Sequence, residues 1–144
     1  MSNHTLLGTW HLISLFAENP AGEKIYPYGD APNGMLMYSP NGTMAAVLMR
    51  RGRARFAGGD VYGATPAELK EAFEGFDAYC GTYTIDDQAG CVIHHVEVSR
   101  FPNWEGSDLT RYYRHMDDQL TLTSEPTHAL GQEWVIHVVW RRRA

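Results

Sequence analysis

Two adjacent histidines and a nearby glutamate, His94, His95 and Glu97, lie within a run of β-forming residues in the 144-residue chain. Imidazole and carboxylate groups can bind a metal ion, and histidine can also exchange protons with a substrate. Successive residues of a strand point to opposite sides of a sheet, so these side chains divide between two faces. The more apolar face comprises Val92, His94, Val96 and Val98. We therefore expect His94 to face the interior, and His95 and Glu97 to face water.

This alternation disfavours a metal site. His95 and Glu97 share a face and supply at most two ligands, whereas a catalytic zinc ion commonly takes three from the protein. The chain has no H-E-x-x-H motif, and neither cysteine sits in a Cys-x-x-Cys motif. Cys80 and Cys91 are expected to be reduced, because hairpin pairing would hold them on the order of 13 Å apart. We expect no metal ion and no other cofactor.

Nucleophilic and phosphate-binding motifs are absent as well. The chain contains no Gly-x-Ser-x-Gly elbow, and the glycines within 50–60 match neither a P-loop nor a dinucleotide fingerprint. General acid–base chemistry and ligand binding are the functions that remain.

Extending the strand pairing through even-length turns predicts the neighbours of His94. Gly81 and Tyr113 fall opposite it on the two sides, and Arg111 lies beside Val96, one diagonal step away. Such cross-strand neighbours are about 5–8 Å apart, so His94, Tyr113 and Arg111 are expected to converge on one small ligand. Further lining residues are expected from the next strand, namely Leu122 and Ser124.

This trio permits two functions. A buried guanidinium normally has a carboxylate, water or polar ligand beside it, so Arg111 favours binding of a small hydrophobic molecule with a polar or anionic group. The alternative is a cofactor-independent isomerase or cyclase, in which His94 is the general acid or base while Tyr113 and Arg111 stabilise a developing oxyanion. A purely structural role, with His94 bonded to Tyr113 and Arg111 near Ser124, also stays open.

Short strands are the elements that would position these residues. Turn signals separate nine β-rich segments, which are 6–17, 24–28, 34–38, 43–49, 79–85, 91–99, 109–115, 120–124 and 134–141. Their spacing predicts an all-β fold in one domain, 1–144, built as an antiparallel meander that closes into a barrel or stacks as a sandwich. The interior set is expected to contain Trp10, Leu12, Phe16, Met35, Met37, Met44, Ala46 and Leu48. These residues suit either an adaptable cavity wall or an ordinary core.

One helix interrupts the strands. Thr65 as the N-cap, Pro66 at the first helical position and Glu68 as a capping-box residue predict a helix over 66–78. With the preceding loop, it is expected to cover part of the barrel mouth. Trp104 leaves the histidine strand and is expected either at the pocket entrance or as a plug. Structural roles are expected for Tyr38, Tyr79 and Tyr83.

Several segments resemble the bacterial and fungal lipocalin-like domain family: "LLGTW", "YPYG", "LMYSPNGTMAAVLMR", "FEGFDAYCGTYTIDDQAGCVIHHVEVSRFPNW", "RYYR", "LTLTSEP" and "VVWRRR". The phrases "HHVE" and "FPNW" are the most specific. The resemblance implies an up-and-down barrel of about eight strands with an internal site for a small, largely apolar molecule. It implies that Trp10 closes one end beneath an arginine, Arg141 or a neighbour. Some barrels of similar design are cofactor-free cyclases or isomerases of secondary metabolism.

Charge and hydropathy limit the partners. The formal net charge is −5, which argues against a nucleic-acid or anionic-membrane surface. No apolar run approaches the roughly 20 residues that span a bilayer, and the start lacks the pattern of a signal peptide. We therefore expect a cytoplasmic monomer or homodimer whose partner is a small molecule.

Overall fold

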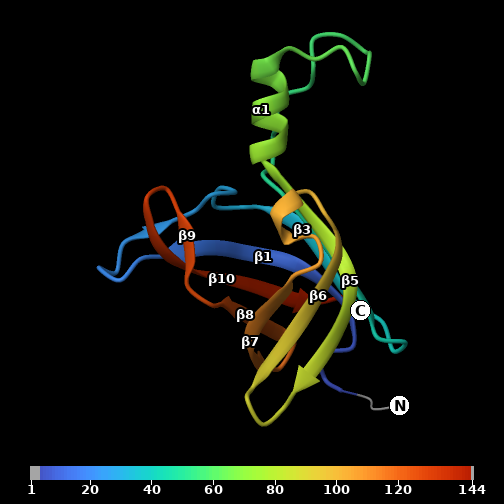
Figure 1. The fold of residues 1–144 in the computed structure, drawn as a ribbon, viewed down its shortest axis with the longest axis vertical. Coiled ribbons are helices and arrows are strands. Elements are labelled where there is room, and N and C mark those ends of the chain that lie inside the picture. Colours follow the sequence, from blue (N-terminus) through green and yellow to red (C-terminus); the bar gives the residue numbers. More distant parts are fainter. Residues whose placement is uncertain (1–3, 144) are drawn as a thin grey trace.

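A computed structural model describes residues 4–143. Eight strands form a closed barrel in the order β1-β3-β4-β5-β6-β7-β8-β10, and pairing of β10 with β1 closes it (Figure 1). All of these pairs are antiparallel. The barrel strands are β1 (Gly8–Glu18), β3 (Asn33–Tyr38), β4 (Thr43–Met49), β5 (Phe76–Asp86), β6 (Cys91–Ser99), β7 (Asp108–Met116), β8 (Gln119–Ser124) and β10 (Gln132–Arg142). The predicted all-β, up-and-down barrel is confirmed.

Two short strands extend the barrel at one end. β2 (Lys24–Ile25) pairs with the end of β1, and β9 (Thr127–Ala129) pairs with the start of β10. The sequence does not predict β9, because three residues are too few to display a two-residue period. Both strands lie at the open end of the barrel, where they extend the rim.

Helix α1 (Pro66–Glu74) begins as predicted. The Thr65 side chain accepts a hydrogen bond from the Glu68 amide, and the Glu68 carboxylate accepts one from the Thr65 amide. The helix ends earlier than predicted, because the chain turns at Gly75 and Phe76 pairs with Met49 as the first residue of β5.

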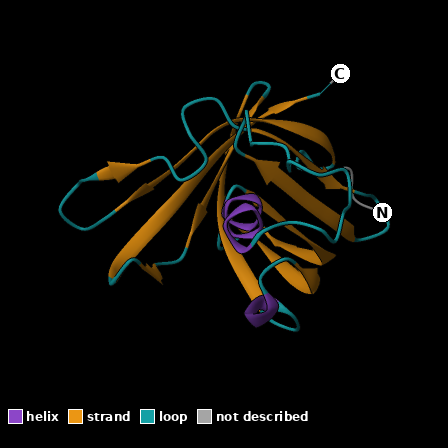
Figure 2. Ribbon diagram, turned by 90° about the horizontal axis from the view of Figure 1, so that it is seen from above, coloured by secondary structure: helices purple, strands orange, loops and turns teal. Residues whose placement is uncertain are grey.

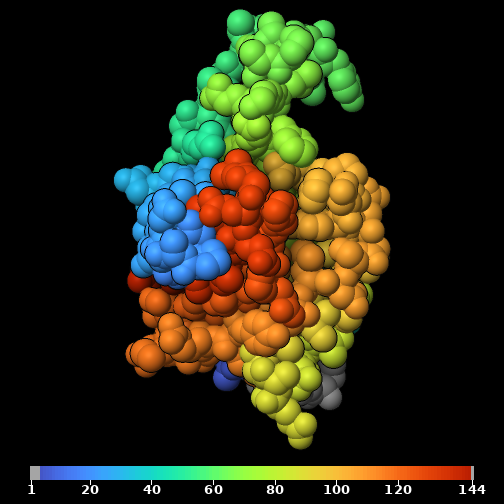
Figure 3. Space-filling model, turned by 60° about the vertical axis from the view of Figure 1, so that its left-hand side comes forward, coloured from blue at the N-terminus to red at the C-terminus, as the bar shows by residue number. Residues whose placement is uncertain are grey.

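The helix was expected to cover part of the barrel mouth, but it does not. It buries none of its residues. Figure 2 shows the helix nearly end-on, and in Figure 3 the helix and its preceding loop project beyond the barrel body. The expected lid is therefore not formed in this structure.

The opposite end of the barrel is closed by Trp10. Its side chain is fully buried, and its indole N–H donates to the Leu6 carbonyl at 3.0 Å. The Arg142 guanidinium covers the ring at 4.1 Å and donates to the Leu7 carbonyl at 2.7 Å and to the Thr5 carbonyl. Arg142 thus takes the position that the family resemblance implied for Arg141 or a neighbour.

Two bulges change which side chains face inward. The pairing of β1 with β10 shifts between Leu12 and Ser14, so Phe16 faces outward and stacks on His137 with ring centroids 4.8 Å apart. The pairing of β5 with β6 shifts at Gly81, and Val98 is 63% exposed. The predictions that Phe16 and Val98 face the interior are wrong, because a bulge adds one residue to a strand and reverses the alternation beyond it.

Cys80 and Cys91 are both free, as predicted. Within residues 4–143, no helix combines the length and apolar character needed to cross a membrane.

Candidate functional site

The barrel encloses a cavity of about 310 Å³. The surface of its wall is largely apolar, and its aliphatic residues include Leu15, Leu36, Ala46, Leu48, Leu122, Ile136 and Val138. The polar wall residues include Tyr79, His94 and Arg111, which come from the adjacent strands β5, β6 and β7. The polar groups therefore gather on one side of a largely apolar chamber, the arrangement that orients a small ligand.

His94 lies between two tyrosines. Its side chain is 1% exposed, its Nε2 lies 2.6 Å from the Tyr38 hydroxyl, and its Nδ1 lies 2.7 Å from the Tyr79 hydroxyl. Burial lowers the pKa of His94 to about 3, and the nearby positive charge of Arg111 acts in the same direction. The imidazole is therefore neutral at physiological pH.

Arg111 brings a positive charge to the cavity wall. Among residues 4–143 it forms no ion pair. Its guanidinium makes a long hydrogen bond of 3.5 Å to the Thr110 carbonyl and lies within hydrogen-bonding reach of the Tyr79 hydroxyl oxygen. Burial raises the pKa of Tyr79, and the proximity of Arg111 opposes that increase. A guanidinium without a carboxylate partner is a natural contact for an acceptor group on a ligand.

Charged and aromatic side chains surround the cavity mouth. Asp77 and Arg100 pair at 3.4 Å, and the Arg100 guanidinium stacks 4.0 Å from the Phe73 ring of helix α1. Trp104, in the 3-10 helix η1 (Pro102–Trp104), packs edge-on against Tyr79 with centroids 5.9 Å apart. Trp104 thus lies at the entrance, and its predicted ligand contact remains a prediction.

Several other expected wall residues face inward. Ala46, Leu48, Leu122 and Ser124 line the cavity, and Arg111 pairs with Ser124 as predicted. Further residues are buried away from the cavity, namely Trp10, Met44 and Val96.

Met35 and Met37 do not face the cavity. Leu36 and Tyr38 are buried instead, and Met37 is 39% exposed. The prediction fails because β3 carries apolar residues on both faces, so alternation alone does not tell the inner face from the outer one.

The expected neighbours of His94 are also wrong. Tyr83 and Leu109, not Gly81 and Tyr113, lie opposite it, and Gly81 pairs with Val96. Each observed pairing differs from the predicted one by an even number of residues. The same side chains therefore face inward, but their cross-strand neighbours differ.

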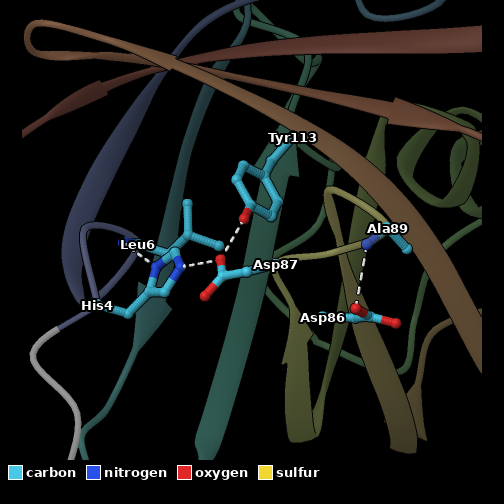
Figure 4. Close-up of polar contacts among 6 residues, drawn as sticks. All are labelled: His4, Leu6, Asp86, Asp87, Ala89 and Tyr113. Atoms are coloured by element: carbon cyan, nitrogen blue, oxygen red, sulfur yellow. Dashed lines mark hydrogen bonds and ion pairs between the residues drawn. The ribbon is translucent and has the colours of Figure 1, made fainter.

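Tyr113 belongs to a separate cluster at the closed end (Figure 4). Its hydroxyl donates to Asp87 Oδ1 at 2.5 Å, and His4 Nε2 contacts the same oxygen at 2.6 Å. The hydrogen bond to Asp87, more than burial, raises the pKa of Tyr113 to about 12. This cluster ties the segment before β1 to the β5–β6 turn, so Tyr113 does not join His94 and Arg111.

Tyr38 and Tyr79 are the site residues that sequence reasoning missed as partners of His94. Tyr79 shares the inward parity of Gly81, and only the correct register brings its hydroxyl to the imidazole. His95, by contrast, lies on the outer face as expected, bonded to Asp108 at 2.8 Å and to Thr84 at 2.8 Å. Within the described residues no three His, Cys, Asp or Glu side chains gather as a metal site.

Comparison with known proteins gives two findings. The family model described as a lipocalin-like domain matches residues 7–143. The 4'-hydroxy-3'-methoxypropiophenone carrier protein of the fungus Aspergillus oryzae is 34% identical over 106 residues, which cover 69% of this chain and 96% of that relative. No solved structure is significantly similar to the chain.

Proposed function

The chain belongs to the lipocalin-like domain family, and from this premise we propose that it is a carrier of a small, largely apolar molecule bearing a polar or anionic group. The observation that carries the proposal is the largely apolar cavity inside the barrel, with Tyr79, His94 and Arg111 on one side. Apolar surface supplies most of the binding free energy, and the few polar groups orient the ligand.

The fungal relative supports the same function. Its name describes a carrier of an aromatic ketone, which combines an apolar ring with a polar carbonyl group. A cavity of about 310 Å³ is at the small end of the range for ligand sites, which suits one ring with a short side chain.

Binding is favoured over turnover by the state of His94. A general base works best when its pKa is near the operating pH, whereas burial lowers the pKa of His94 to about 3. Tyr113, the other member of the expected catalytic trio, is bonded to Asp87 at the closed end. An isomerase or cyclase using these residues therefore has less support than a carrier.

The proposal is tested by titrating the protein with 4'-hydroxy-3'-methoxypropiophenone and recovering the compound afterwards for mass analysis. We expect saturable one-to-one binding and an unchanged compound. Arg111→Met should weaken binding about tenfold, because a hydrogen bond from a charged donor is lost. Arg114→Met is the matched control, since Arg114 is exposed on the outer face of the same strand. Absence of saturable binding would overturn the carrier function, and a chemically altered product would favour the isomerase.

A further inference from the structure

Resting on the proposed carrier function, we propose that the cavity selects ligands by an oxygen atom that accepts hydrogen bonds, and that the Tyr79 hydroxyl is the donor that recognises it. His94 and Tyr38 are positioning residues, because together they direct the Tyr79 proton into the cavity. The ligand class is an aromatic or alicyclic molecule with a ketone, carboxylate or phenolate oxygen.

The neutral His94 ring carries a single N–H group. Both ring nitrogens lie within hydrogen-bond distance of a tyrosine hydroxyl, so the ring donates to one tyrosine and accepts from the other. Two arrangements are possible. They differ in which tyrosine keeps a proton that points away from the imidazole.

Tyr38 decides between them. Its side chain is 1% exposed and does not line the cavity, and among residues 4–143 its hydroxyl contacts His94 alone. If Nε2 carried the proton, the Tyr38 O–H would be buried without an acceptor, which costs about 1–3 kcal/mol. Tyr38 therefore donates to Nε2, and the ring proton is on Nδ1.

The Nδ1–H group then donates to the Tyr79 oxygen at 2.7 Å. The proton of Tyr79 is not used by His94 and is free to point elsewhere. Because Tyr79 lines the cavity, this proton can point into the cavity and donate to an acceptor atom of a bound ligand.

The wall offers further donors beside Tyr79. Arg111 offers guanidinium N–H groups beside Tyr79, and the buried Trp140 Nε1–H has no acceptor among the described residues. Ser124 has no proton to spare, since its hydroxyl donates to the Glu125 carbonyl at 2.7 Å. The one wall carboxylate, Asp77, forms an ion pair with Arg100 at 3.4 Å, although its Oδ1 makes no hydrogen bond among the described residues. A ligand that presents an acceptor to Tyr79, Arg111 and Trp140 therefore matches this part of the wall.

The test compares two ligands of similar shape, propiophenone and propylbenzene, in the wild type and in Tyr79→Phe. Tyr79→Phe should weaken propiophenone binding about tenfold, because the hydrogen bond to the carbonyl is lost. The affinity for propylbenzene should change less than about twofold, because this ligand has no oxygen atom that could accept a hydrogen bond from Tyr79. Comparing each ligand between the two proteins removes the difference in ligand hydration.

Tyr83→Phe is the matched control. Tyr83 is on the same strand, but its hydroxyl donates to the Ser39 carbonyl at 2.7 Å and it does not line the cavity. This variant should leave the binding of both ligands unchanged. Equal weakening of both ligands by Tyr79→Phe, or no weakening of either, would overturn the inference while leaving a carrier function intact. Failure of both ligands to bind the wild type would instead count against the carrier function.

A second measurement needs no variant. Long-range ¹H–¹⁵N correlation spectra distinguish the protonated nitrogen of a neutral imidazole from the bare one. We expect His94 of the wild-type protein to carry its proton on Nδ1. A proton on Nε2, or on both nitrogens near neutral pH, would contradict the assigned direction of the Tyr79 proton.

Discussion

The buried imidazole of His94 makes stability depend on pH. Its pKa is about 3 in the folded protein and 6.5 without burial, so below pH 6.5 the unfolded chain binds a proton that the folded protein does not. The free energy of unfolding should therefore fall as pH decreases from about 6.5 towards 3, with a slope approaching about 1.4 kcal/mol per pH unit from this residue.

Urea unfolding between about pH 7 and pH 5 measures this slope, because most carboxylates stay ionised in that range. His94→Gln should lose the contribution. The exposed His128, changed to Gln, should keep it. A wild-type slope equal to that of His94→Gln would show that His94 is protonated in the folded state.

At the scale of strands, Gly81 makes a close approach possible. A Cβ atom at this position would lie 1.9 Å from the His95 carbonyl oxygen, at the bulge between β5 and β6. Gly81→Ala should therefore destabilise the protein by about 3 kcal/mol, near the upper end of the range for overpacking. Thermal or urea unfolding measures the loss.

Gly58→Ala is the control, because a Cβ atom there meets nothing within 4 Å. Its unfolding midpoint should match the wild type. If Gly81→Ala unfolded at the wild-type midpoint, the bulge would have a different backbone geometry from the one described.

Helix α1 should unfold independently of the barrel. Thr65→Ala removes the N-cap and should destabilise the helix by about 1 kcal/mol. Because the helix buries no residue, its loss should leave the global unfolding midpoint unchanged. Hydrogen exchange should report faster exchange of helix amides alone. A matching fall in barrel protection would mean that the helix and barrel unfold as one unit.

The strands and the barrel are largely readable from the sequence, whereas the site is only partly so. Turn residues mark where strands end, and the capping box of Thr65 marks the start of the helix, because these signals are local. Register is not local. The bulges near Ile13 and Gly81, and the 3-10 helix between β6 and β7, shift the pairing without a sequence signal that a single chain displays.

The consequence is visible at the cavity. The sequence predicts the inner face of His94 correctly because that face of its strand is the more apolar one. It predicts the inner face of Arg111 correctly because the inferred register differs from the observed one by an even number of residues. The same error exchanged Tyr79 for Tyr113 as the partner of the imidazole. The prediction that Met35 and Met37 face the interior is wrong for a different reason, because both faces of β3 are apolar.

For the whole molecule, the two ends of the barrel have different roles. The closed end is sealed by Trp10 beneath Arg142 and by Asp87, which His4 and Tyr113 contact. The open end leads to the cavity between Trp104 and the Asp77–Arg100 pair. A ligand that enters there binds only the folded barrel and should raise its stability in proportion to the logarithm of ligand concentration.

The most direct test of this account is isothermal titration of propiophenone into the wild type, Ala46→Phe and Ala45→Phe. Ala46 lines the cavity, so a phenyl ring there occupies ligand space, whereas Ala45 is the neighbouring residue on the outer face of β4. We predict one-to-one binding to the wild type and to Ala45→Phe, and at least about tenfold weaker binding to a folded Ala46→Phe. Equal affinity for all three proteins would place the ligand outside the barrel and contradict the account.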